Sequence, residues 1–327
     1  MLASVARCYN SGGMALFLLK RFTGFIVTLI AATLVVFLVL EVLPGDPAQV
    51  MLGVDAQPDQ LRALHAELGL DRPAGLRYLA WIGGLVQGDL GTSYTYHVPV
   101  AELVGERLAV TVPLALLAMA LTTVLALGLG VYAAAHRDGP GDVGIMALSQ
   151  LGIAVPNFWF AILLVLLFAV KLAWFPSGGF PGWGAGIGAA LKALLLPAIA
   201  LAVVQAAILT RITRSSVIEM LGEDFVRTAR AKGNSRFRTL WRHVLRNALV
   251  PIVTIMGLQF SSLLAGTIIV ENVFTLPGLG RLVFQAITQH DLVVIQDVVV
   301  LLAALVIAIN LAVDLLYLAI DPRLRGR

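Results

Sequence analysis

Six long apolar stretches with almost no charged side chains constrain the fold of this chain more than any other feature. A helix that crosses the roughly 30 Å hydrocarbon core of a bilayer needs about 20 mostly apolar residues. The stretches predict an all-α integral membrane protein with six transmembrane helices, because a helix satisfies all its backbone hydrogen bonds internally. They are Phe22–Leu40, Leu108–Ala135, Val143–Val170, Ala193–Thr210, Asn247–Val270 and Val298–Val313, the last continuing as an apolar pattern to Ile320.

Composition supports this class and argues against a soluble enzyme. Hydrophobic residues make up 59% of the 327 residues, against roughly 45–50% in soluble domains. Only 13% are charged. The single cysteine, Cys8, cannot form an internal disulfide. Four prolines near or inside the stretches are interpreted as helix starts or kinks: Pro113, Pro156, Pro197 and Pro251.

The distribution of basic residues predicts the orientation in the membrane. Sixteen of the 23 Lys and Arg residues lie on the side that holds both termini, and nine of these fall within residues 211–246. Cytoplasmic loops carry an excess of Lys and Arg, so both termini are expected in the cytoplasm. The net charge of +4 is therefore attributed to cytoplasmic loops, and no nucleic-acid partner is expected.

These assignments divide the chain into four parts. Residues 1–13 are interpreted as an optional leader, because Met14 opens a compact start before the first apolar stretch. Residues 14–107 hold the first transmembrane helix and a long extracytoplasmic loop. Residues 108–321 hold five transmembrane helices, and residues 322–327 form a cytoplasmic tail. Within the extracytoplasmic loop, the spacing of leucines predicts a short amphipathic helix over Pro58–Leu70, and Tyr78–Leu85 is predicted to lie at the interface.

The loop 211–246 contains a further predicted helix over Glu223–Lys232. Acidic residues at its start and basic residues towards its end match the helix dipole, and Glu223 is spaced to pair with Arg227. Gly233 is expected to end this helix. Phe225, Ala229 and Lys232 are expected to share one face. A solvated basic loop with no partner is the alternative interpretation.

The sequence from Arg227 to Pro251 reads RTARAKGNSRFRTLWRHVLRNALVP. It resembles the coupling motif of permease subunits in binding-protein-dependent ABC importers of the dipeptide, oligopeptide and nickel type. Only Ala229, Gly233 and Leu245 fit the general form of that motif, but the RTARAKG string is the form of this subfamily. The resemblance covers about 300 residues and is closest to the first of the two permeases in such systems. Its other matching segments are Leu43-Pro44-Gly45-Asp46-Pro47, Leu68-Gly69-Leu70-Asp71, Gly88-Asp89-Leu90-Gly91-Thr92-Ser93, Val155-Pro156-Asn157-Phe158-Trp159, Glu271–Leu282 and Asp314–Arg323.

The resemblance implies a type I importer permease that imports dipeptides or oligopeptides across the cytoplasmic (inner) membrane. Its implied partners are a second homologous permease, two cytoplasmic ATPases, an extracytoplasmic binding protein and the bilayer. ATP and Mg²⁺ would be bound by the ATPases, since no Gly-x-x-x-x-Gly-Lys-Ser/Thr string occurs here. The residues implied to couple this chain to an ATPase are Glu223, Asp224, Phe225, Arg227, Thr228, Ala229, Arg230, Lys232 and Gly233.

Polar residues inside transmembrane helices are costly and tend to face a cavity or a partner. Gln259, Glu271, Asn310 and Asp314 are therefore candidates for the substrate pathway. Packing is the alternative for three of them: Gln259 and Asn310 can bond neighbouring helices, and Asp314 can pair with a basic loop residue. The histidines are too scattered for a metal site, and none is expected.

Two other classes of protein were weighed against this interpretation. An intramembrane enzyme is disfavoured because no metalloprotease or nucleophile motif and no paired carboxylates on one helix face occur. A stand-alone secondary transporter would show matching halves, but the loops 43–107 and 211–246 have no counterparts. The cargo stays open among peptides, nickel complexes, glutathione and opines.

Overall fold

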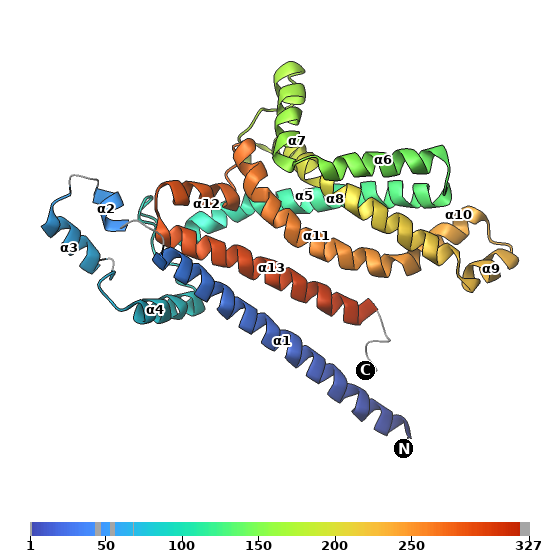
Figure 1. The fold of residues 1–327 in the computed structure, drawn as a ribbon, viewed down its shortest axis with the longest axis horizontal. Helices are drawn as coiled ribbons and strands as arrows, with labels where there is room; N and C mark the ends of the chain where they lie inside the picture. The colour runs from blue at the N-terminus through green and yellow to red at the C-terminus, as the bar shows by residue number, and fades with distance from the viewer. Residues whose placement is uncertain (1, 43–46, 53–55, 68, 321–327) are drawn as a thin grey trace. The chain divides into compact units, whose positions relative to one another are not determined.

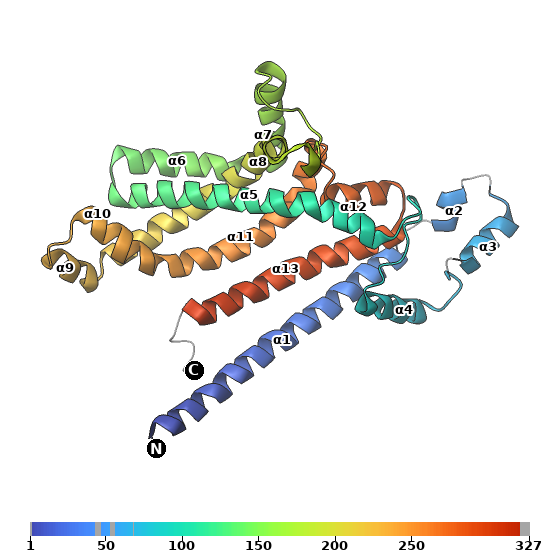
Figure 2. The same cartoon turned by 180° about the vertical axis from the view of Figure 1, so that it is seen from behind.

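The fold is helical throughout the residues that the structure, a computed structural model, describes: 2–42, 47–52, 56–67 and 69–320. No strand occurs within these ranges, although Thr92 and Pro99 form an isolated antiparallel bridge. The Pro44-Gly45-Asp46 segment and the predicted tail 322–327 lie outside the described residues. The α-helices (Figures 1 and 2) are α1 (Leu2–Val42), α2 (Pro47–Leu52), α3 (Pro58–Glu67), α4 (Ala74–Gln87), α5 (Val100–Ala135), α6 (Pro140–Ala154), α7 (Asn157–Leu164), α8 (Ile187–Leu221), α9 (Asp224–Ala231), α10 (Arg236–Thr239), α11 (Leu245–Val273), α12 (Leu279–Thr288) and α13 (Leu292–Ile320).

Five continuous helical segments are long and apolar enough to cross a membrane. They are Leu19–Val42, Val100–Ala135, Ile187–Leu221, Arg236–Val273 and Leu292–Val313. These segments confirm five of the six predicted apolar crossings, with longer helices than the sequence suggested. The last begins at Leu292, whereas the sequence predicted Val298, because the buried Asp297 is accommodated inside the helix by a hydrogen bond from Trp81.

The third predicted span is not one straight helix. It consists of α6 and then α7 continued by a π-helical turn η1 (Val165–Lys171), and the two parts meet at an angle of 101° (Figure 1). Pro156 explains the break, since the residue before a proline is driven out of the helical region. Val155 accordingly has φ −84° and ψ 123°. The described residues therefore contain a sixth candidate span only if α6 and α7 with η1 are counted as one bent span.

The residues 211–246, predicted as a loop, are mostly helical. Helix α8 continues to Leu221, so Arg211 and Arg214 lie on its last turns. The chain then forms α9, α10 and a π-helical turn η3 (Leu240–Val244) before α11. Only residues 222–223 and 232–235 within this stretch are outside helices.

The described helices form two compact units. One comprises Met1–Lys20, Val112–Leu276 and Ile309–Arg327. In it, glycines allow close helix packing: a Cβ at Gly130 would lie 2.6 Å from the Thr213 side chain of α8, and a Cβ at Gly257 would overlap Val313 of α13. Small residues at such crossings are typical of membrane helices, where tight packing replaces the hydrophobic effect.

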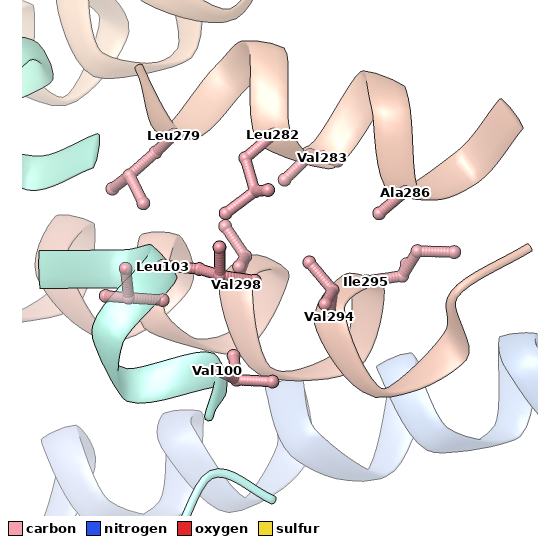
Figure 3. Close-up of a cluster of buried hydrophobic side chains, with 10 residues drawn as sticks. Val100, Leu103, Leu279, Leu282, Val283, Ala286, Val294, Ile295 and Val298 are labelled. Carbon is pink, nitrogen blue, oxygen red and sulfur yellow. The ribbon is translucent and has the colours of Figure 1, made fainter. Parts of the chain in front are cut away.

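The second unit comprises Arg21–Thr111 and Pro277–Ala308. Its core brings the start of α5 against α12 and the start of α13, as Figure 3 shows. The predicted helix Pro58–Leu70 ends earlier, at Glu67, and Gly69 adopts φ +66° in the turn that follows. The predicted interfacial stretch Tyr78–Leu85 lies within α4. The core residues are Val100, Leu103, Val104, Leu279, Leu282, Val283, Ala286, Val294, Ile295 and Val298.

Candidate coupling segment and buried polar residues

The helix expected at Glu223–Lys232 is present as α9, between α8 and α10 (Figure 2). Glu223 is its N-cap and Lys232 its C-cap. Gly233 follows in the left-handed region with φ +81°, where a side chain is strained and glycine is not. Its N–H donates to the Arg230 carbonyl at 2.9 Å, which confirms that the chain leaves the helix at this glycine.

One face of α9 is buried against its own chain. Val226 and Ala229 are 2% and 7% exposed, and Phe225 is half-buried. Ala229 was expected to offer a small contact surface to a partner, but the structure places its side chain inward. Phe225 and Ala229, four residues apart, share this side of the helix, and Lys232 is the exposed C-cap. Val226 packs in a cluster with Ala126, Val131, Ala134, Leu209, Val217, Val244, Leu245, Ala248 and Ile252.

The opposite face of α9 is polar and exposed. Asp224, Arg227 and Thr228 lie on it, since residues three and four apart share a helix face. Arg227 pairs with Asp224 at 3.4 Å, and not with Glu223 as the sequence suggested. Arg230, the residue after the buried Ala229, is also exposed. The segment thus presents charged and hydroxyl groups outward while its apolar side chains anchor it.

The turn after α9 is held by its own side chains. Asn234 Nδ2 donates to the Ala229 carbonyl at 3.1 Å, and Ser235 Oγ accepts from the Arg238 N–H at 3.2 Å as the cap of α10. Two large aromatic side chains on α10 and η3, Phe237 and Trp241, are exposed, with ring centroids 6.1 Å apart. Sequence reasoning did not single out these aromatic residues, although their position among arginines was a visible signal.

The candidate pathway residues are placed mainly in helix contacts. Gln259 is 5% exposed, and its Nε2 donates to the Gln205 carbonyl of α8 at 2.9 Å. Glu271 is fully buried. Both side chains are buried within this chain, and their role in the substrate pathway stays a prediction. Asn310 accepts a hydrogen bond from Ser261 Oγ at 3.2 Å, and the Asp314 side chain lies outside the described residues.

A buried ion pair in the same unit escaped the sequence analysis. Arg214 Nε and Nη2 donate to the two carboxylate oxygens of Asp142 at 2.5 and 2.6 Å, and the Asp138 N–H also donates to Asp142 at 2.9 Å. The pair ties the end of α8 to the start of α6. No local pattern could have found it, because the partners are 72 residues apart.

Within the described residues, no group of three or more His, Cys, Asp or Glu side chains is arranged to hold a metal ion. The arrangement instead combines long apolar helices with one short, anchored, polar-faced helix.

Comparisons with known proteins agree with this description. Residues 126–326 match the family described as binding-protein-dependent transport system inner membrane component, and residues 14–115 match the N-terminal part of such components. The chain is 44% identical over 319 residues to a putative peptide transport system permease protein of Brucella abortus (strain 2308), which covers 95% of this chain and 99% of that protein.

Two further relatives have similar coverage. Oligopeptide transport system permease protein AppB of Bacillus subtilis (strain 168) is 38% identical, over 95% of this chain and 99% of that protein. Glutathione transport system permease protein GsiC of Salmonella choleraesuis (strain SC-B67) is 40% identical, over 94% and 98%. An inward-facing structure of the MetNI methionine ABC transporter is similar in fold, with a TM-score of 0.56, 19% identity, and coverage of 67% of this chain and 96% of that chain.

Proposed function

The chain belongs to the family of binding-protein-dependent transport system inner membrane components, and we propose that its cargo is dipeptides or oligopeptides. It is a permease subunit of an ABC importer. In our proposal it forms half of the translocation pathway with a second homologous permease. Two ATPase subunits bind ATP and Mg²⁺, and an external binding protein delivers the cargo. Two relatives whose names include the words peptide transport or oligopeptide transport support this cargo class.

The observation that carries the coupling role is the two-sided environment of α9. Val226 and Ala229 anchor it in the chain's own core, while Asp224, Arg227 and Thr228 face outward. Val226 shares a cluster with residues of α8, η3 and α11, so a force on the outer face of α9 would be passed to these elements. Docking of this face in a groove of an ATPase subunit would therefore couple ATP-driven closure to the permease.

The proposed orientation follows from the basic residues of α8 to η3. The excess of Lys and Arg in residues 211–246 favours the cytoplasmic side for α9, as docking to a cytoplasmic ATPase requires. Both termini then lie in the cytoplasm and the loop 43–107 lies outside. Gln259, Glu271, Asn310 and Asp314 are the proposed pathway residues, because polar side chains inside membrane-crossing helices tend to face a cavity or a partner.

Site-directed cross-linking tests the coupling role. With Cys8→Ser as background, Thr228→Cys places a thiol on the outer face of α9, and a short bifunctional reagent is expected to join it to the ATPase subunit in the assembled transporter. Gly188→Cys on α8 is the control, since nothing lies within 4 Å of a Cβ at this glycine and it is distant in sequence from α9. Absence of an ATPase cross-link from Thr228→Cys in the apo, ATP-bound and ADP-bound states would refute coupling through α9.

Glutathione is the second candidate cargo, favoured by the 40% identity to a glutathione permease. Uptake of a labelled dipeptide and of labelled glutathione by the reconstituted importer, each in competition with unlabelled dipeptide, glutathione, nickel complexes or an opine, separates these cargoes. Strong competition by dipeptides alone supports the proposal, and competition by glutathione alone supports the second candidate.

A further inference from the structure

A small cleft of about 230 Å³ lies in the second unit, between the end of α1, the turn after α3, helix α4 and the start of α13. Its volume is below the roughly 300–1,000 Å³ of pockets for drug-sized ligands, so it admits a small molecule or one end of a larger one. Every residue that lines it belongs to the same compact unit. The coupling role and the cargo proposed above do not involve this cleft.

The polar lining of the cleft carries a net positive charge. Arg72 and Arg77 line it together with a single acidic residue, Glu41. Arg77 Nη2 is already bonded to Glu41 Oε1. The exposed Arg72 side chain folds against Gly69, with Nε 3.8 Å from the position of a Cβ there, and no salt bridge of Arg72 is found within the described residues. The cleft therefore attracts a group with one negative charge.

Two hydrogen-bond donors at the cleft have no partner within the described residues. Arg77 Nε and Gln296 Nε2 are both inaccessible to solvent and unbonded. A buried donor without an acceptor destabilises the fold, and a bound ligand or water is one way to satisfy it. Both residues line the same cleft, so an acceptor group with two or more oxygens bound there is the candidate partner for these donors.

A third donor is available from Tyr94, which also lines the cleft. Burial raises the pKa of the Tyr94 hydroxyl, and the negative charge of Asp291 raises it further, while Arg77 opposes the shift. The hydroxyl therefore keeps its proton at neutral pH and can donate it. The remaining wall is apolar, with Phe37 and Trp81 stacked at a centroid distance of 6.3 Å. Trp81 is held in place by its Nε1–H bond to Asp297 at 2.7 Å.

We propose that this cleft binds a small organic anion, in which one carboxylate or phosphate group contacts Arg72, Arg77 and Gln296 and an apolar body rests on Phe37 and Trp81. The carboxylate of a free solute and the phosphate of a lipid headgroup share this chemistry. The net positive charge of the lining and the unpaired donors favour an anion over a cation, and the aromatic wall accounts for the apolar body.

Binding to the purified full-length chain tests the proposal, with one probe for each source. N-acetyl-L-leucine, titrated by calorimetry in lipid-free detergent, represents the free carboxylate, and N-acetyl-L-leucinamide is its uncharged control. Phosphatidylglycerol retained during purification and detected by native mass spectrometry represents the lipid phosphate. Arg72→Gln and Gln296→Leu remove cleft donors. Arg62→Gln and Gln87→Leu remove the same groups from exposed positions of α3 and α4 outside the cleft.

We expect Arg72→Gln to weaken binding of the effective probe about tenfold or more, as expected for loss of a charge-assisted contact. Glu41→Gln raises the cleft charge and frees Arg77, so it should tighten binding. If the cleft variants lose only the binding of N-acetyl-L-leucine, the ligand is a free carboxylate. If they lose only the retained phosphatidylglycerol, the ligand is a lipid headgroup. The proposal is overturned if neither probe binds the wild-type chain, or if the cleft and control variants bind equally.

Discussion

Single buried carboxylates join segments that lie far apart in this chain. Asp291 is the clearest case: its Oδ1 accepts the Val294 N–H at 3.3 Å at the start of α13, and its Oδ2 accepts from Ser93 Oγ at 2.5 Å and from the Thr95 N–H at 3.0 Å. A short polar side chain at this position is a preferred N-cap. Ser93, the last residue of the matching segment Gly88–Ser93, thus has a structural role, because it supplies the hydroxyl that the buried carboxylate requires.

The Asp142–Arg214 pair leads to an asymmetric prediction. Arg214→Gln leaves a carboxylate with a 3% exposed side chain uncompensated, whereas Asp142→Asn leaves an arginine that is 24% exposed and can turn towards solvent. Breaking a buried pair typically costs about 3–5 kcal/mol, and the accessible arginine should reduce the cost to about 1–2 kcal/mol for Asp142→Asn. Apparent melting temperatures in nanodiscs measure the difference.

Arg211→Gln, on an exposed position of the same helix, is the control for this comparison and should change stability by less than about 0.5 kcal/mol. Equal losses for Arg214→Gln and Asp142→Asn would contradict the assignment of Asp142 as the more deeply buried partner.

At the scale of the elements, short helices and breaks matter as much as the long apolar helices. α9 is only eight residues long, and isolated helices of this length are marginal in water. It exists because Val226 packs into the cluster with residues of α8 and α11, because Ala229 is buried, and because Gly233 and Asn234 close its end. The break at Pro156 similarly turns one apolar stretch into two helices that point in different directions.

Gly233 is the position at which α9 is most sensitive to substitution. A β-branched residue is strongly strained at φ +81°, whereas asparagine tolerates the left-handed region. No atom outside its chain neighbours lies within 4 Å of a Cβ at this position, so the two substitutions differ in backbone strain and not in packing. We expect Gly233→Val to abolish ATP-dependent uptake and Gly233→Asn to retain a substantial part of it.

Membrane insertion of both Gly233 variants should equal that of the wild type, because the strain is confined to one turn. Uptake of a labelled dipeptide by proteoliposomes and the amount of protein in the membrane fraction measure the two effects. Full uptake by Gly233→Val would show that the end of α9 does not matter for coupling.

At the scale of the whole molecule, the distribution of charge gives a prediction about topology. If α9 lies inside and the loop 43–107 outside, Gln57→Cys in a Cys8→Ser background should react with a membrane-impermeant maleimide in intact cells. Ala231→Cys should react only after the cells are permeabilised. Both positions are exposed in the structure, so a difference in labelling reports the side of the membrane. The reverse pattern would invert the proposed orientation and exclude docking of α9 to a cytoplasmic ATPase.

The sequence by itself was sufficient for the all-helical membrane fold, for five continuous crossings and for the existence and end of α9. These features depend on local properties, namely long apolar runs, charges near helix ends and a glycine, which can be seen in the order of residues. The family resemblance was likewise visible in strings such as the one that follows Arg227.

Only the tertiary structure decided which side of each helix is buried and which distant side chains pair. It placed Ala229, Gln259 and Glu271 inside the bundle, and joined Asp142 to Arg214 across 72 residues. It also gathered Arg72, Arg77 and Gln296 around one cleft. The physical reason is that burial, pairing and unpaired donors depend on contacts between distant segments, and no local pattern of residues encodes those contacts.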